Sequence, residues 1–247
     1  MCEYDMKPAL DLSIAQIPDF THWIDAQKWI EQGLALIPVS RRMNQIQEES
    51  LVTLEWKDFS GISPSAQETL FGFFPSLNWR KFVLAVFFAD LVSYPDPRNQ
   101  VNFDRLLFIL HSYPQGFRVY WSLFPDGSRW PVGYTGWYPM LESQFHLLAQ
   151  DPQKMKSRMI LPAVDDPILS KSFIYLFNFS VAKPFRMTSL SSALMKSYCW
   201  DLSQAQAQGL CLIAVSQHGE KMAERLGMSC TGWLGDGMRR DRVYIGA

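Results

Sequence analysis

The sequence predicts an α+β chain, in which a mixed sheet is flanked by helices, and two patterns support this prediction. Helix-like spacing of apolar residues dominates the first hundred residues, whereas short apolar runs separated by turn residues follow from Leu106 onward. The composition agrees, because 48% of the 247 residues are hydrophobic and 14% are aromatic, which is enough for a large core. We therefore expect a largely helical region over residues 1–100 and a mixed core over residues 101–247.

The helices of the N-terminal region are expected over two stretches. Apolar residues recur at helical intervals over residues 18–47, and the aromatic-rich stretch 71–92 also fits a helix. The longest uninterrupted apolar run, residues 82–89, ends at Asp90 and is shorter than the roughly 20 residues that cross a bilayer. We expect no membrane span.

Strands are expected from the middle of the chain onward. Residues 106–110, 117–124 and 130–138 are apolar or aromatic runs with turn residues between them, which is typical of an antiparallel meander. Residues 141–171 interrupt the pattern with mixed polar content, so we interpret them as an insertion. The apolar and aromatic run 173–181 then predicts a further strand.

The last seventy residues predict the order strand, helix, strand, helix, strand, strand when the run 173–181 is included. Apolar residues from Leu190 to Ala205 follow a helix face, and Gly209 is placed where we expect the left-handed stop of that helix. The continuous apolar run 210–215 predicts a strand covered on both faces. A short helix stopped by Gly227 and two closing strands follow.

Charge and composition exclude several partners and sites. The chain has 23 Lys+Arg against 24 Asp+Glu, which gives a formal net charge of -1. Binding to the phosphate backbone of a nucleic acid requires a clear excess of basic residues, so we do not expect a nucleic acid as partner. The first residues lack a basic stretch followed by an apolar one, so we expect a cytoplasmic protein. No CxxC pair and no pair of closely spaced histidines is present, so we expect reduced thiols and no metal.

A motif after the strand 173–181 indicates a family. Val181 is followed five positions later by Arg186, and serines stand at positions 189 and 191. This spacing resembles the acyl-CoA loop of the GNAT superfamily of N-acyltransferases, in which glycines occupy the two serine positions. Further on, Leu226-Gly227-Met228 matches a second family motif. The resemblance covers roughly residues 105–247.

The resemblance implies a fold, a reaction and partners. The fold is a twisted mixed sheet flanked by helices, and the reaction moves an acyl group from acetyl-CoA, another acyl-CoA or another acyl thioester to an amine. The amine would belong to a small molecule or a protein, and a homodimer is one expected oligomeric state. The donor-binding residues implied by position are Val181, Arg186, Met187, Thr188, Ser189, Leu190, Ser191, Ser192 and Ser216.

The two serines leave two outcomes open for the donor loop. If Ser189 or Ser191 had to adopt a left-handed backbone, it would cost about 1–2 kcal/mol, comparable to the gain from a charge at a helix N-terminus. Serine is also a good N-cap and can donate its hydroxyl to a phosphate. The loop therefore either binds CoA in a retuned form or has lost it.

The catalytic groups are the second departure from the family. The family often uses a tyrosine to protonate the leaving thiolate, but Ala223 stands at the matching position and cannot transfer a proton. We consider Tyr134, Glu142 and His218 as catalytic candidates, with Tyr138 and Tyr198 as further phenols. Together with the serines, Ala223 also favours an alternative: a scaffold that kept the fold, lost the reaction and now binds a ligand or a protein.

The insertion and the aromatic residues each have more than one interpretation. Long connections inside compact domains are often lids, so we hypothesise that residues 141–171 cover the acceptor site. Trp130, Trp137 and Trp233 either fill the core or line an apolar channel for an acyl chain or a bulky acceptor.

Overall fold

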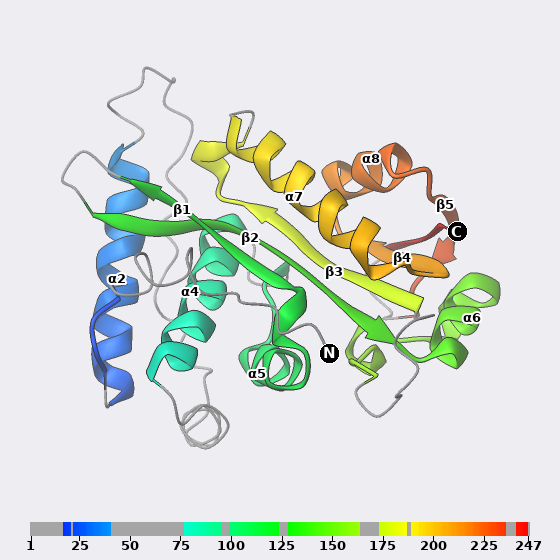
Figure 1. Cartoon of the computed structure of the whole chain (residues 1–247), viewed down its shortest axis with the longest axis horizontal. Helices are drawn as coiled ribbons and strands as arrows, with labels where there is room; N and C mark the ends of the chain where they lie inside the picture. The colour runs from blue at the N-terminus through cyan, green and yellow to red at the C-terminus, as the bar shows by residue number, and fades with distance from the viewer. Residues whose placement is uncertain are drawn as a thin grey trace. The chain divides into compact units, whose positions relative to one another are not determined.

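The structure is a computed structural model, and it describes most of the chain (Figure 1). The described residues are 17–20, 22–40, 77–94, 99–123, 128–163, 173–186, 189–235 and 241–246.

A six-stranded sheet organises the chain, with the strand order β1-β2-β3-β4-β6-β5. The sheet is mixed, because β3 and β4 run parallel while β6 runs antiparallel to both β4 and β5. The strands are β1 (Phe117–Leu123), β2 (Arg129–Met140), β3 (Phe173–Val181), β4 (Gly209–Ala214), β5 (Ser229–Trp233) and β6 (Arg242–Gly246).

Six α-helices and several short 3₁₀ turns accompany the strands in the described part of the chain. The helices are α2 (Trp23–Ser40), α4 (Leu77–Ser93), α5 (Phe103–Ser112), α6 (Glu142–Gln150), α7 (Ser189–Ala205) and α8 (Gln217–Arg225). None of these helices is long and apolar enough to cross a membrane. The predicted fold class, a mixed sheet flanked by helices, is confirmed.

The chain divides into two compact units. The first comprises Met1–Leu107, Val119–Tyr134 and Ser180–Thr188, and the second comprises Phe108–Arg118, Thr135–Phe179 and Ser189–Ala247. Each unit therefore contains several separate stretches of sequence. The expected boundary near residue 100 stays a prediction.

Aromatic stacking holds the first unit together. Helices α2 and α4 lie side by side (Figure 1), and Trp29 of α2 stacks on Trp130 of β2 with ring centroids 4.9 Å apart. Phe88 of α4 lies 5.2 Å from the same Trp29 ring. Gly33 makes this approach possible, because a Cβ atom there would lie 2.3 Å from the Trp130 ring. Of the two interpretations of Trp130, the structure therefore favours the core.

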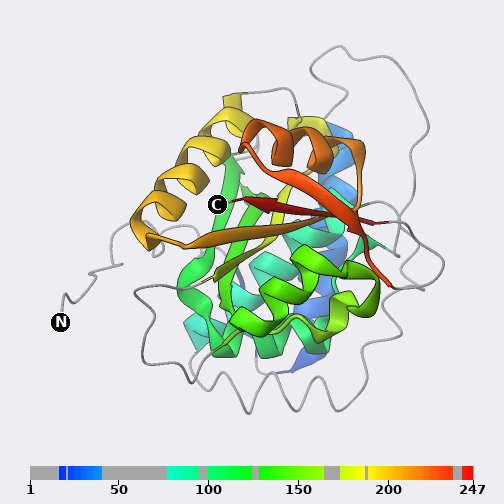
Figure 2. The same ribbon diagram turned by 90° about the vertical axis from the view of Figure 1, so that its right-hand side faces the viewer.

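The core of the second unit lies between the sheet and two helices. Helices α7 and α8 lie on one side of β4, β5 and β6, while α6 lies on the other side (Figure 2). The buried cluster includes Leu176 of β3, Tyr198 of α7, Leu212 of β4 and Ala223 of α8. These apolar contacts explain why residues with helical spacing in the sequence form α7 and α8.

Two local expectations were wrong. Residues 106–110, expected as a strand, lie in α5, whose start is capped by Asn102: its side-chain oxygen accepts from the Arg105 N–H at 3.1 Å. Gly209 does not stop α7, because the left-handed residue is Gln206, with φ 47°, and Gly209 begins β4. Gly227, with φ 75°, does follow α8 in the left-handed conformation, as expected.

Candidate functional site

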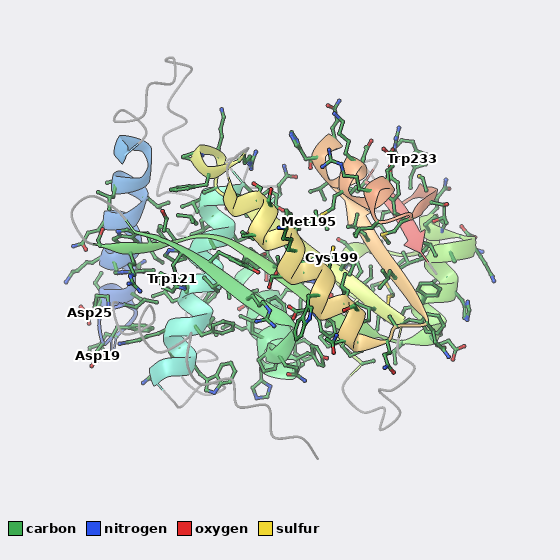
Figure 3. The ribbon with its side chains drawn as sticks, turned by 45° about the horizontal axis from the view of Figure 1, so that its top comes forward. Asp19, Asp25, Trp121, Met195, Cys199 and Trp233 are labelled. Atoms are coloured by element: carbon green, nitrogen blue, oxygen red, sulfur yellow. The ribbon has the colours of Figure 1, made fainter. Side chains whose placement is uncertain are left out.

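The most distinctive backbone feature of the second unit is the early end of the pairing between β3 and β4. The register runs from Phe173 opposite Gly209 to Leu176 opposite Leu212, although β3 continues to Val181 and β4 to Ala214. The two strands begin together and then diverge (Figure 3). Beyond Leu176, the β3 backbone makes no ladder bond to β4. We therefore consider the divergence of the two strands as a candidate ligand site.

Helix α7 begins with the serines of the predicted donor loop. The helix starts at Ser189, and Ser191 is half-buried while Ser192 is exposed. The first N–H groups of a helix have no intrahelical acceptor, and they carry the positive end of the helix dipole. Among the described residues only Gln206 is a non-glycine with positive φ, so Ser189 and Ser191 carry no left-handed strain. Met187 and Thr188 lie outside the described residues.

Arg186 of the first unit is tied to backbone carbonyls. Its Nε donates to the Val181 carbonyl at 2.9 Å, and Nη2 donates to the Ser93 carbonyl at 2.6 Å. Ser93 is the last residue of α4, so the guanidinium caps the negative end of that helix. Partial burial lowers the pKa of Arg186 from its usual value, and nearby Tyr94 opposes this shift. Arg186 therefore has a structural role here that its position in the motif did not suggest.

Ser216 and His218 lie at the start of α8. The Ser216 side chain accepts from the Gly219 N–H at 3.2 Å, which makes Ser216 the N-cap of the helix. His218 is the second residue of the helix and is exposed. The structure thus gives Ser216 a local capping role and leaves His218 in solvent.

The three phenols considered as acids are all buried and all hydrogen-bonded. Tyr134 donates to Asp90 Oδ1 at 2.7 Å, and Tyr138 donates to the Ile160 carbonyl at 2.9 Å. Tyr198 donates to the Gly136 carbonyl at 3.1 Å, and burial holds its pKa well above the usual value. A phenol with a raised pKa and a committed proton is a weak general acid.

Glu142 is the first residue of α6, a helix that packs at the beginning of β3. Its carboxylate lies 3.3 Å from His146 Nε2, and both side chains are largely exposed. The neighbouring Phe145 stacks on Phe173, the first residue of β3, with ring centroids 4.3 Å apart. Helix α6 therefore packs at the beginning of β3, whereas the pairing with β4 ends at its fourth residue, Leu176.

The described part of the insertion is a packed structural element. The Gly235 N–H donates to the Met155 carbonyl at 3.0 Å, and Thr231 of β5 donates to the Leu148 carbonyl at 3.0 Å. A Cβ atom on Gly235 would lie 1.8 Å from the Gln153 carbonyl oxygen. These contacts join the insertion to β5 and to the residues just after it, so they do not support a lid formed by residues 142–163.

Ala223, the position that the motif resemblance aligns with the tyrosine of the GNAT superfamily, has no space for a larger side chain. Ala223 is completely buried in the core of the second unit, beside Met222 and Tyr198. A larger side chain there would have to displace packed neighbours. Among the described residues, no group of three or more His, Cys, Asp and Glu side chains is placed to hold a metal ion.

Sequence reasoning missed one buried carboxylate. Asp90 of α4 is completely buried, and its Oδ2 accepts from the Val101 N–H at 2.8 Å while Oδ1 accepts from Tyr134. The available signal was an acidic residue directly after the apolar run 82–89 of a buried helix. A carboxylate in such a place requires hydrogen-bond donors, since its burial is otherwise very costly.

Comparison with known proteins gives likeness of fold only. No protein-family model matches the chain, and no curated protein matches it significantly. The structure is similar to Ard1 from Thermoplasma volcanium, with TM-score 0.36 and 15% identity over 59% of this chain and 78% of that chain. It is also similar to the GNAT-like decarboxylase GphF in complex with isobutyryl-CoA, with TM-score 0.43 and 15% identity over 67% of this chain and 94% of that chain. A third similar structure is the histone acetyltransferase HPA2 and related acetyltransferase from Corynebacterium glutamicum, with TM-score 0.38 and 16% identity over 68% and 90% of the two chains. At these identities and TM-scores the likeness assigns neither a reaction nor a substrate.

Proposed function

We propose that the chain binds an acyl thioester, of CoA or of an acyl carrier, and transfers the acyl group to an amine. The main support for the proposal is the divergence of the parallel strands β3 and β4 after Leu176 and Leu212. It leaves a strand edge that can bind a thioester arm in extended form, and it lies in the same unit as the N-terminus of α7. The motif resemblance from Val181 to Ser191 supports the same reaction.

The groups of the second unit fit the two ends of such a donor. Backbone N–H groups of β3 beyond Leu176 are the candidates for polarising the thioester oxygen. The first turn of α7 offers unpaired N–H groups and the hydroxyls of Ser191 and Ser192 to a pyrophosphate, and its backbone is unstrained without glycine. CoA supplies the activated acyl group, and the chain contributes binding and orientation.

The reaction we propose works by positioning and uses no dedicated side-chain acid. Tyr134, Tyr138 and Tyr198 are buried and hydrogen-bonded, and Ala223 has no proton to give. A thiolate is a fairly good leaving group, so the absence of an acid costs roughly the 10²–10⁴-fold that general acid–base help provides. Holding the amine against the carbonyl remains the larger source of rate.

A second candidate is a scaffold that binds an acyl thioester and does not turn it over. The specific observation in its favour is the buried position of Ala223, which leaves no room for the phenol that the family often uses. The donor site would be the same in both cases.

The test combines turnover with one pair of variants on α7. Release of free thiol from acetyl-CoA is measured with and without a panel of amines. Ser191→Asp places a carboxylate at the positive end of the helix, where it is tolerated but repels phosphates. The matched control is Ser203→Asp, an exposed serine near the other end of the same helix.

If the chain is an enzyme, we expect thiol release that depends on the amine. Ser191→Asp should slow this release by raising the KM for the donor, and Ser203→Asp should leave the rate and the KM unchanged. The scaffold predicts the same loss of donor binding and no amine-dependent release. Absence of both binding and release in a folded sample contradicts both functions for a CoA thioester.

A further inference from the structure

Two neighbouring side chains of β2 have buried polar atoms that lack hydrogen-bond partners. Within the described part of the chain, neither Thr135 Oγ1 nor Trp137 Nε1 has one. Thr135 is 1% exposed, so its hydroxyl is shut away from bulk water. Buried polar groups are nearly always paired in native proteins, so two orphans at positions i and i+2 of one strand call for an explanation.

Trp137 packs beside the last paired residues of β3 and β4. It packs against the buried cluster that contains Leu176 and Leu212, which are the last pair in the parallel register. Residues two apart on a strand point to the same face, so Thr135 shares that face with Trp137. Between them, the Gly136 carbonyl accepts the Tyr198 hydroxyl from α7 at 3.1 Å.

The surroundings fix the indole and keep the site apolar. The Tyr113 ring lies 5.4 Å from the Trp137 ring at a tilt of 58°, which restricts the plane of the indole. Phe179 of β3 and Met195 of α7, the latter labelled in Figure 3, pack against the same cluster. Trp137 as a residue is only half-buried, although its Nε1 atom is buried.

The hydrogen-bonding capacity of Thr135 and Trp137 determines which kind of ligand group can satisfy both side chains. An indole N–H can only donate a hydrogen bond, and a hydroxyl beside it can donate as well. An acceptor oxygen on an otherwise apolar ligand satisfies both donors, and a carbonyl oxygen with two lone pairs does so alone. The Cα atoms of residues two apart on a strand are about 7 Å apart, so one oxygen would have to bridge the two donors across this spacing.

We infer that Thr135 and Trp137 bind the carbonyl oxygen of the acyl thioester. This inference rests on the proposed function, and it adds side-chain donors from β2 to the backbone N–H groups of β3. The pair would recognise the acyl thioester itself and discriminate against a CoA derivative that has no carbonyl. It binds the oxygen in the ground state and, because negative charge grows there during transfer, more strongly in the transition state.

The test uses two ligands that differ in this one oxygen. Acetyl-CoA has the thioester carbonyl, and S-ethyl-CoA replaces it with a methylene group. Dissociation constants of both are measured by calorimetry for the full-length wild-type chain, Thr135→Val and Trp137→Phe. Both substitutions remove the donor; Thr135→Val keeps the shape of the side chain, whereas Trp137→Phe also shortens the ring system. The control is Thr231→Val, whose hydroxyl already donates to the Leu148 carbonyl.

We expect the wild type to prefer acetyl-CoA and each variant to lose about 2- to 12-fold of that preference, the range of one hydrogen bond. The affinity for S-ethyl-CoA should not change. In the absence of ligand, Thr135→Val should melt no lower than the wild type, because it removes an unpaired polar group at nearly constant shape, whereas Thr231→Val should melt lower.

Two results would overturn the inference. If both variants keep the full preference for acetyl-CoA, the donors do not contact the carbonyl, while the proposed function stands. If the wild type binds neither ligand in a folded state, the proposed function fails for CoA thioesters and this inference fails with it.

Discussion

At the scale of single residues, the buried carboxylate of Asp90 is the feature that most constrains the first unit. It accepts from the Tyr134 hydroxyl on one oxygen and from the Val101 N–H on the other. Breaking such a network is costly, because a buried charge then lacks a donor. Tyr134, which we considered as a catalytic acid, is therefore a hydrogen-bond donor to a carboxylate 44 positions away in the sequence.

The hydrogen bond between Tyr134 and Asp90 could not be predicted from the sequence. The strand position of Tyr134 was predicted from the aromatic run 130–138, but its partner lies on a different element. Only the packed fold decides which buried polar groups meet. The same holds for Thr135 and Trp137, whose lack of partners depends on everything around them.

We expect Tyr134→Phe to lower the free energy of unfolding by about 1–3 kcal/mol, since it leaves one Asp90 oxygen without this donor. Chemical denaturation measures the change. Tyr138→Phe is the matched control: its acceptor is the neutral Ile160 carbonyl, so we expect a loss of about 0.5–1.5 kcal/mol. Equal denaturation midpoints for Tyr134→Phe and the wild type would show that the phenol does not support the carboxylate.

A pH dependence follows from three buried groups of the second unit. Burial raises the pKa of Tyr113 to about 12, and it also raises the pKa values of Tyr198 and Cys211. In the unfolded chain these groups ionise at about 10 for tyrosine and about 8.5 for cysteine. Because the folded pKa values are higher, the stability these groups contribute is complete below the unfolded pKa values and is lost as the pH rises from the unfolded toward the folded values.

We therefore expect the denaturation midpoint to fall steadily between about pH 9 and pH 12. Tyr198→Phe removes one of the three groups, so the same titration should become less steep for that variant. A midpoint that is constant over this range would contradict the burial of these groups.

At the scale of elements, local sequence predicted the C-terminal half well. The helices α7 and α8 and the strands β3 and β4 were predicted because their apolar spacing matches their burial. The strand predicted over residues 106–110 was wrong because a short apolar run fits a strand and a buried helix equally well. The deciding signal was the capping residue Asn102, which lies before the run.

The site was predicted only in outline. Spacing alone identified the donor loop and its serines, but it did not show that Arg186 bonds to the carbonyls of Val181 and Ser93. The end of the β3 and β4 pairing also has no marker in the sequence, because Phe177 to Phe179 continue the apolar strand pattern.

We expect Arg186→Ala to lower the free energy of unfolding by about 1–2 kcal/mol, because two backbone carbonyls, one of them at the end of α4, lose a charged donor. Lys183→Ala, an exposed residue three positions earlier, should change it by less than about 0.5 kcal/mol. Urea denaturation compares the two. Unchanged stability together with lost acyl-CoA binding would instead assign the guanidinium to the donor, as the motif implied.

At the scale of the whole molecule, the N-terminal region is joined to later strands through one shared core. The first unit combines residues up to Leu107 with part of β2, and Trp130 of that strand stacks on Trp29 and Phe88. The sequence predicted helices in this region but not their partners. Aromatic residues far apart in the sequence meet here, and composition alone does not determine which ones.

We expect the fragment 101–247 not to fold by itself, because Trp130 would lose Trp29 and Phe88, and Tyr134 would lose Asp90. Thermal unfolding of the fragment, followed by near-UV circular dichroism beside the full chain, tests this. A cooperative transition in the fragment would establish residues 101–247 as an independent domain.

The most direct test of the proposed function is a calorimetric titration of the full chain with acetyl-CoA, a long-chain acyl-CoA and free CoA. We expect saturable binding, with at least one thioester bound more tightly than free CoA, because we propose that donors on β2 and β3 bind the acyl carbonyl. Absence of binding by all three ligands to a folded sample would contradict the assignment of the diverging strands β3 and β4 as a CoA-thioester site.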